Sequence, residues 1–361
     1  MKKLNHSKFK HLIILSQENL ELSALEAREF LELDDSKTVV LKNIILTEIS
    51  KKNLEKISRL AFSKKVLKIL FIEKNTNTAI NDKFDIEKFI KKIELFNFSK
   101  FYDTNFCLRI HNYSNNENHS NNEQFINNNS SFFTEPELSK PIWRSLDGRG
   151  ITPEVNLKFP KTLFEIIILD NEIFFTKNIF ENSENFEIRK AHYKPELHPT
   201  AMHPKMARGL INILNRKKIL DPFCGAGGII TEAALMNVKA TGYDIDNAMI
   251  NRAKINLNNY NISKKNYQLI KKNCLDEKSF ENLVTDLPYG KSSKKSDDLM
   301  ILYVEFFKKI SGRAIVVMPD FVDYKKVIKN LPKKLVVKKL IKHYVHKSLT
   351  RIILLIDFKK I

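Results

Sequence analysis

The chain has 361 residues, of which 61 are Lys or Arg and 42 are Asp or Glu, so its formal net charge is +19 at pH 7. This length allows two or three domains. The charge excess favours a polyanionic partner, although a Lys-rich proteome would give the same bias. No apolar run approaches the roughly 20 residues that cross a bilayer, and none of the three cysteines lies in a CxxC pair. We therefore expect a cytoplasmic protein with no membrane partner, no disulfide framework and no metal.

The first part of the chain mixes strands and helices. Apolar runs predict strands at 11–15 and 39–46, and spacings of three and four residues predict an amphipathic helix at 22–30. The apolar positions of residues 54–70 suit one or two helices.

A polar segment and a hairpin follow. In residues 106–110 apolar residues alternate around Arg109, which predicts a strand. Residues 111–131 are rich in Asn, Ser and Glu, and we interpret them as a flexible surface insertion. Two apolar runs, 163–169 and 172–176, flank Asp170-Asn171 and predict a hairpin.

The pattern changes after the polar residues 181–197. Pro204 begins a helix, and strands and helices then alternate as in a doubly wound α/β fold. The last two strands, 335–341 and 350–358, are too close for a crossover helix, so they should be antiparallel. By fold analogy, this ending is typical of Rossmann-like methyltransferases and not of nicotinamide-binding domains. The intervening elements are expected at 218–221, 228–236, 240–244, 248–258, 267–271, 283–286, 298–310 and 314–318.

A glycine turn, DPFCGAGG, joins the first strand of this domain to its helix. Gly225 and Gly227 permit a tight turn and a close approach of the backbone to a ligand. Asp244 ends the next strand, where an acid can accept hydrogen bonds from ribose hydroxyls. A dinucleotide fingerprint needs a third glycine where this chain has Ile230.

S-adenosylmethionine fits this turn better than a dinucleotide does, because it carries an ammonium in place of a pyrophosphate. Asp221 can pair with that ammonium, and Phe223 lies in the same turn. The simpler interpretation is a strand-helix turn of another α/β enzyme. A third contact, to adenine, is expected after the third strand, where Asn273 takes the place of the usual Asp and Asp276 lies one turn later.

The second motif is Asp286-Leu287-Pro288-Tyr289, directly after an apolar strand. An exocyclic amine must localise its lone pair on nitrogen before it attacks a methyl group. Acceptors for its N–H bonds promote this: the Asp286 carboxylate, which also faces the cofactor, and a carbonyl of Leu287 or Pro288. Tyr289 can stack on a base withdrawn from its helix. Taken alone, an Asp that ends a strand is more often a cap, and the glycine turn makes this motif specific.

Covalent catalysis through cysteine is the competing mechanism. Cytosine C5 methylation needs a nucleophilic thiolate beside the base, but Cys224 lies in the cofactor turn, and Cys274 and Cys107 have no basic motif beside them. We therefore favour methylation of a base amine.

With these motifs the domain resembles the archaeal tRNA guanosine-N2 methyltransferases that act at position 10. The matching segments are FEIRKAH at 186–192, HPTAMHPKMAR at 198–208, the glycine turn, the Asp286 motif, and HKSLTR at 346–351. The front half resembles the THUMP domain of that family only in pattern, best at 106–110 and 155–160.

This resemblance implies an α+β THUMP-like RNA-binding region, followed by a Rossmann-like methyltransferase domain that uses S-adenosylmethionine. It also implies tRNA as partner, a wall near the cofactor from His198 to Pro204, and Arg351 or Lys347 as a phosphate contact. Oligomeric state stays open between a monomer and a chain with an accessory subunit. The expected domains are an α/β segment at 1–50, the THUMP-like domain at 51–180, a linker at 181–197 and the methyltransferase domain at 198–361.

Two other functions remain open. One is a related base methyltransferase, acting on N2 of guanine in rRNA or on N6 of adenine. Guanine is favoured because its N1–H and its amine can both donate to a carboxylate such as Asp286. The other is an RNA-binding scaffold with an inactive methyltransferase fold, although Asp221, Asp244, Asp286 and Tyr289 are all present. The number of methyl groups added stays open.

Overall fold

Two compact units make up the chain, and each is assembled from non-consecutive segments. The computed structural model describes residues 9–74, 85–113, 133–169, 172–196, 202–290 and 296–359. The first unit comprises Met1–Ile14, Asp34–Ile49 and Lys64–Glu181, and the second Leu15–Leu33, Ser50–Ser63 and Asn182–Ile361. In the described ranges no helix has the length and apolar character needed to cross a bilayer.

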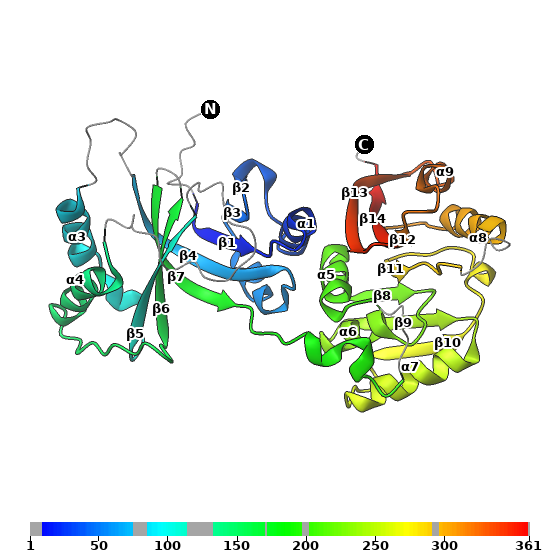
Figure 1. Ribbon diagram of the computed structural model, residues 1–361, viewed down its shortest axis with the longest axis horizontal. Helices are drawn as coiled ribbons and strands as arrows, with labels where there is room; N and C mark the ends of the chain where they lie inside the picture. Colours follow the sequence, from blue (N-terminus) through cyan, green and yellow to red (C-terminus); the bar gives the residue numbers. More distant parts are fainter. Residues whose placement is uncertain are drawn as a thin grey trace. The chain divides into compact units, whose positions relative to one another are not determined.

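The first unit is built on a seven-stranded sheet in the order β2-β3-β1-β4-β7-β6-β5 (Figure 1). β5 and β6 are parallel, whereas β6–β7, β4–β7, β1–β3 and β2–β3 are antiparallel. Helices α3 and α4 pack on each other and help to bury a phenylalanine-rich core that includes Phe89 and Phe164. The elements are β1 His11–Leu15, β2 Val39–Leu41, β3 Ile44–Thr47, β4 Ser63–Lys74, α3 Ile86–Leu95, β5 Phe106–Asn112, α4 Glu135–Asp147, β6 Thr162–Leu169 and β7 Glu172–Glu181.

Several sequence predictions for this unit are confirmed and others are wrong. β1 and the antiparallel pair β6–β7 lie where the apolar runs predicted them. The single strand expected at 39–46 is two strands, because Lys42 adopts a left-handed backbone (φ 53°) and reverses the chain. The one or two helices expected over 54–70 are wrong: α-helix ends at Leu54, a single 3-10 turn lies at Ile57–Arg59, and β4 begins at Ser63 and pairs with β7. Most of the predicted insertion, 114–131, lies outside the described residues.

The second unit contains the predicted doubly wound sheet. Its strand order is β10-β9-β8-β11-β12-β14-β13, and the five strands from β10 to β12 are parallel. β14 is antiparallel to both β12 and β13, as the short final connection predicted. The fold class is therefore a Rossmann-like α/β domain. Its strands are β8 Lys218–Asp221, β9 Lys239–Asp244, β10 Tyr267–Lys271, β11 Leu283–Asp286, β12 Ala314–Pro319, β13 Leu335–His346 and β14 Leu349–Phe358.

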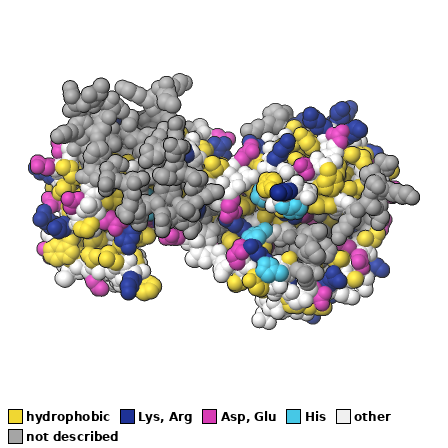
Figure 2. Space-filling view, in the orientation of Figure 1, with side chains coloured by type: hydrophobic (Ala, Val, Ile, Leu, Met, Phe, Trp, Pro, Cys, Tyr) yellow, Lys and Arg dark blue, Asp and Glu magenta, His cyan; other side chains and the backbone are white. Residues whose placement is uncertain are grey.

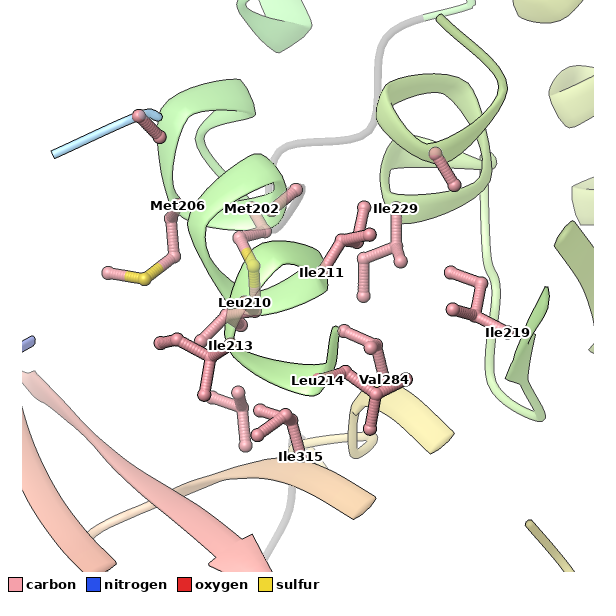
Figure 3. Close-up of a cluster of buried hydrophobic side chains, with 14 of the residues drawn as sticks. Met202, Met206, Leu210, Ile211, Ile213, Leu214, Ile219, Ile229, Val284 and Ile315 are labelled. Atoms are coloured by element: carbon pink, nitrogen blue, oxygen red, sulfur yellow. The ribbon is translucent and has the colours of Figure 1, made fainter. Parts of the chain in front are cut away.

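Helices pack against this sheet and form two separate hydrophobic cores with it. One core takes apolar side chains from α1, α5, α6 and α7, and the other from α8 and α9. Figure 3 shows the first, in which residues of α5 such as Leu210 and Leu214 lie beside Val284 and Ile315 of the sheet. The helices are α1 Leu20–Phe30, α2 Lys51–Leu54, α5 Pro204–Leu214, α6 Gly228–Leu235, α7 Asn247–Asn259, α8 Ser296–Lys308 and α9 Tyr324–Ile328. Single 3-10 turns lie at Asp35–Lys37, Ile57–Arg59, Phe98–Lys100, Glu187–Arg189, Ala191–Tyr193 and Cys274–Asp276.

Two segments from the front of the chain belong to this second unit. The buried Glu26 of α1 accepts hydrogen bonds from the backbone N–H groups of Ala61 and Phe62 (both 2.7 Å) and from the Asn212 amide on α5 (2.7 Å). The Phe62 ring fills the space where Gly209 lacks a side chain. Contacts therefore group the chain differently from the consecutive ranges expected from sequence, and those functional domain boundaries stay a prediction.

Candidate active site

Asp221 and Asp286 lie on either side of the point where the strand order reverses. Asp221 is the last residue of β8 and Asp286 is the last residue of β11. These two strands are neighbours, while the chain continues from β8 outward to β9 and β10. Open α/β sheets bind ligands at the carboxyl ends of such strands, so both predicted motifs meet at the expected edge.

The Asp221 carboxylate is buried, and its hydrogen-bond donors in the described part of the chain are uncharged. Its side chain accepts from the Thr285 hydroxyl (2.7 Å) and from the Phe223 backbone N–H (3.3 Å). Burial, followed by the charges of Asp286 and Asp244, raises the pKa of Asp221 to about 7, against the opposing effect of those two donors. Among the described residues no Lys, Arg or His pairs with Asp221. A ligand cation would complete this site.

The glycine turn leads directly into α6. Gly227 has a left-handed backbone (φ 80°) and caps the helix with no side-chain hydrogen bond. A Cβ at Gly227 would lie 3.0 Å from the Cβ of Ala253, so the turn requires glycine on both counts. Ile230, at the third fingerprint position, is fully buried in the core. The first N–H groups of α6 thus have no side-chain cap. With Ile230 in place of the third glycine, the turn lacks the feature that lets a helix pack closely on the strand in a dinucleotide site.

The predicted adenosine contacts lie at the ends of the next two strands. Asp244, at the end of β9, accepts from the N–H of Gly225 (2.9 Å), and its backbone carbonyl accepts from the N–H of Lys272 (2.9 Å). Asn273 follows β10, and its side-chain oxygen accepts from the N–H of Leu275 (3.0 Å). These bonds place Asp244 against the glycine turn. Asn273 caps the 3-10 turn Cys274–Asp276, and its contact with adenine stays a prediction.

The Asp286 carboxylate belongs to a three-residue cluster. The Tyr289 hydroxyl donates to one carboxylate oxygen (2.6 Å), and the Arg351 guanidinium donates to the other (3.3 Å) and to the Tyr289 oxygen (2.9 Å). Burial raises the pKa of Asp286 to about 6, although Arg351 and Tyr289 act in the opposite direction. Arg351 is only 6% exposed, so it is not a solvated strand end, and the phosphate contact implied by the resemblance stays a prediction.

Two backbone carbonyls of the same turn were predicted as second acceptors. The carbonyl of Pro288 accepts from the buried Tyr303 hydroxyl (2.7 Å). Within the described chain no donor reaches the carbonyl of Leu287, whose N–H is bonded to the carbonyl of Val317 (2.9 Å). Of these two carbonyls, only that of Leu287 lacks a donor among the described residues. Phe223 packs edge-on against Phe306 (ring centroids 5.3 Å apart), and its predicted place in the cofactor site stays a prediction.

The three thiols are unsuited to nucleophilic catalysis. Cys107, Cys224 and Cys274 are buried, and burial raises the pKa of each thiol. Attack on a base requires the thiolate, so this chemistry agrees with the preference for an amine acceptor. Over the described ranges, no three His, Cys, Asp or Glu side chains gather as a metal site would require.

Comparisons with known proteins identify the family of the chain. A family model described as RMKL-like, methyltransferase domain, matches residues 191–352, and one described as DNA methylase matches residues 23–255. The chain is 34% identical over 161 residues to a Methanothermococcus thermolithotrophicus protein named probable tRNA (guanine(10)-N2)-dimethyltransferase, covering 41% of this chain and 95% of that protein. The chain belongs to the tRNA (guanine(10)-N2)-dimethyltransferase family.

Longer relatives are matched over a smaller share of their length. The Methanocaldococcus jannaschii tRNA (guanine(10)-N2)-dimethyltransferase is 33% identical over 54% of this chain and 60% of its own length. The Pyrococcus abyssi protein of the same name is 32% identical over 59% of this chain and 67% of its own length. The alignment thus spans less than two thirds of the first of these relatives.

One further residue, Lys194, which no sequence motif marks, lies beside the start of α6. The Lys194 ammonium lies 4.0 Å from the place that a Cβ on Gly228, the first residue of α6, would take. Burial lowers the pKa of Lys194, and no described carboxylate forms an ion pair with it, since Glu232 pairs with Arg189 and Arg208. Lys194 lies in the polar stretch 181–197, between the matching segments 186–192 and 198–208, so no motif marked it.

The His198 to Pro204 wall is only partly described. His198 lies outside the described residues. His203 caps α5, where its Nδ1 accepts from the N–H of Lys205 (3.2 Å), and its Nε2 lies 3.2 Å from Glu187. These contacts are those of helix-entry packing, and the predicted wall stays a prediction.

We expect Asp221→Asn to stabilise the free protein. The folded-state pKa of Asp221, about 7, exceeds the unfolded value of about 4. Stability from this group is therefore full below pH 4 and is lost as the pH rises to 7, by an amount on the order of a few kcal/mol. Asparagine can still accept from Thr285. Urea unfolding without ligand at pH 8 should show a higher midpoint for the variant, and an equal or lower midpoint would contradict an uncompensated carboxylate.

Proposed function

We propose that this protein transfers methyl groups from S-adenosylmethionine to N2 of a guanosine in tRNA, at position 10. The observation that carries the proposal is that Asp221 and Asp286 end neighbouring strands at the switch point. An acid suited to the cofactor ammonium and an acid suited to a base amine thus lie at one edge of the sheet. The names of its relatives support the base, the RNA and the position. The same names include a dimethyl product, so we propose N2,N2-dimethylguanosine as the end product.

The residues of the site fit S-adenosylmethionine. Asp221 is a buried carboxylate with no cationic partner among the described residues, and it would receive the ammonium of the methionine part. Lys194 and the uncapped N–H groups at the start of α6 would receive its carboxylate. Asp244 would accept from the ribose hydroxyls, and the second lone pair on the Asn273 side-chain oxygen would accept from the adenine amine. S-adenosylmethionine supplies a methyl group on a sulfonium, which leaves as neutral S-adenosylhomocysteine.

The protein's own residues then align and activate the amine. We propose that guanine replaces the Tyr289 hydroxyl at the Asp286 carboxylate, donates N1–H and N2–H to that carboxylate, and donates its second N2–H to the carbonyl of Leu287. These acceptors hold the nitrogen lone pair toward the methyl group. The freed Tyr289 ring stacks on the base. After attack, Asp286 takes the N2 proton, or passes it to water, so the charge on the amine is removed.

Arg351 supports guanine over adenine in this scheme. Its guanidinium lies beside the carboxylate oxygen that would receive N1–H. Guanine has two donors at this edge and the O6 acceptor next to them, which suits a carboxylate beside a cation. Adenine would turn the lone pair of its N1 toward the Asp286 carboxylate. The remaining alternatives, a ribosomal guanine or adenine N6, predict other products.

We also propose that the first unit is the THUMP-like RNA-binding region implied by the resemblance. Its sheet carries two helices, α3 and α4. In this scheme it holds the tRNA while the second unit reaches the guanine.

The experiment that tests the function is mass spectrometry of nucleosides from a tRNA transcript after incubation with the protein and S-adenosylmethionine. We expect N2-methylguanosine first and N2,N2-dimethylguanosine later. Replacing the guanosine at position 10 should remove both products. N6-methyladenosine would refute the proposed base, and unmodified RNA with intact cofactor binding would indicate a scaffold.

Asp286→Ala should reduce methyl transfer by about a hundred- to ten-thousand-fold, because the amine loses its main acceptor. Binding of S-adenosylhomocysteine, measured by calorimetry, should change little, since Asp221 and the glycine turn remain. Incorporation of labelled methyl at the wild-type rate would show that the amine-activation argument is wrong.

Lys194→Met should weaken cofactor binding by about ten- to a hundred-fold, the usual effect of losing one charge-assisted hydrogen bond. The rate at saturating cofactor should be nearly unchanged. Lys190→Met is the matched control, because the Lys190 ammonium is paired with Glu187. Equal cofactor KM values for the two variants would exclude Lys194 as the carboxylate partner.

Arg351→Met should shift the acid limb of the pH profile of kcat/KM upward. Asp286 must be ionised to accept N–H bonds, its pKa is about 6, and Arg351 holds that pKa down. Without the guanidinium the pKa rises, so activity at pH 6 should fall much more than activity at pH 9. Lys347→Met, which removes an exposed cation nearby, should leave the profile in place. An equal loss of activity at every pH would indicate a purely structural role for Arg351.

A further inference from the structure

The opposite edge of the methyltransferase sheet carries a basic hollow of about 660 Å³. Lys218 and Lys239 begin β8 and β9, so the hollow lies at the amino ends of the strands whose carboxyl ends carry Asp221 and Asp244. Seven of its twelve lining residues are basic and only Glu32 is acidic. We call this hollow the amino-edge groove.

Most of these cations have no acidic partner. Glu32 is paired with Lys56 (3.5 Å), and among the described residues Lys52 and the exposed series Arg216 to Lys218 form no ion pair, nor does Lys239. On the face of the second unit in Figure 2, by contrast, basic side chains are interspersed with acidic and apolar ones. Like charges held together without counter-charges oppose folding. The gathering of cations in the groove therefore does not stabilise the fold and needs a separate reason.

Helix dipoles account for only part of this charge. The helices α1, α5 and α6 end near the groove, at Phe30, Leu214 and Leu235. A helix carboxyl end carries about half a negative charge, so three such ends offset roughly one and a half of the positive charges. With Glu32 included, about four or five positive charges remain.

A half-buried guanidinium in the groove, that of Arg59, is also incompletely satisfied. Arg59 lies over the ring of Phe30 (4.9 Å to the centroid) and donates to the Asn212 side chain (3.3 Å). Its Nε is buried and has no hydrogen-bond partner among the described residues. A buried donor of this kind is costly unless a ligand or water accepts from it.

We propose that the amino-edge groove binds a run of phosphates of the RNA substrate. This inference rests on the proposed function, because it takes RNA as the substrate. A single phosphate cannot neutralise four or five cations spread over three chain segments, whereas a nucleic-acid backbone can. β9 has six residues and spans about 20 Å at 3.3 Å per residue. The bound phosphates therefore belong to nucleotides distant from the target base.

The test compares two triple variants of the full chain. The groove variant is Lys217→Gln, Lys218→Gln and Lys239→Gln, and the control is Lys264→Gln, Lys265→Gln and Lys333→Gln, all of them exposed. The Kd for a tRNA transcript is measured without methyl donor from 50 to 300 mM salt. Groove substitutions should raise the Kd about tenfold or more at low salt and reduce the slope of log Kd against log salt by about two to three.

Further readouts separate this inference from the proposed function. The groove variant should keep the wild-type kcat at saturating tRNA and the wild-type affinity for S-adenosylhomocysteine, and should be no less stable to heat. An unchanged Kd and salt slope would overturn the inference. So would a variant that loses binding of tripolyphosphate but keeps its tRNA affinity, because the groove would then hold a small anion. If wild type binds tRNA with the expected slope and transfers no methyl group, the groove stands and the proposed function fails.

Discussion

The burial of Asp221 between β8 and β11 is the constraint on which the rest of the site depends. Two further carboxylates, Asp244 and Asp286, lie near enough to oppose its ionisation. Neutral groups donate to Asp221, and Arg351 donates to Asp286. In the part of the chain that the structure describes, no cation pairs with Asp221. A ligand that brings an ammonium, hydroxyl groups and N–H donors compensates these acids. The binding free energy of such a ligand therefore includes removal of the electrostatic cost that burial and mutual repulsion impose on these carboxylates.

The parallel sheet separates charge between its two edges. Right-handed connections place the amino end of α6 at the carboxyl edge, where Asp221 lies, and the carboxyl ends of α5 and α6 at the amino edge, where the lysines lie. Helix dipoles favour this distribution, but the lysines exceed what the dipoles require. Carboxylates at the catalytic edge, such as Asp221 and Asp286, do not themselves attract a polyanion. Basic residues elsewhere on the protein can supply the attraction that brings RNA to that edge.

Sequence periodicity predicted the second unit well and the first only in part. The strands β8, β10 and β11 were predicted to the residue, because each is a short apolar run bounded by polar turn residues. Residues 63–70 were misread as helix, since the spacing of Val66, Leu67 and Leu70 suits either a helix or a strand. Their pairing with β7, more than 100 positions away, decides the outcome. Helices α3 and α4 were not predicted, and α3 adjoins residues outside the described ranges.

The two motifs located the acids, but the sequence alone could not show which cation forms an ion pair with Asp286. Arg351 reaches it across 65 positions because β14 runs antiparallel to β12, with Arg351 opposite Pro319. The alternation of buried and exposed residues that usually sets strand register is missing here, since Arg351 to Asp357 are all buried. A slip by one residue would place Thr350 or Ile352 beside Asp286 and leave a buried carboxylate uncompensated. The ion pair thus contributes to the register of the strand that delivers it, which makes Arg351 both a structural and a chemical part of the site.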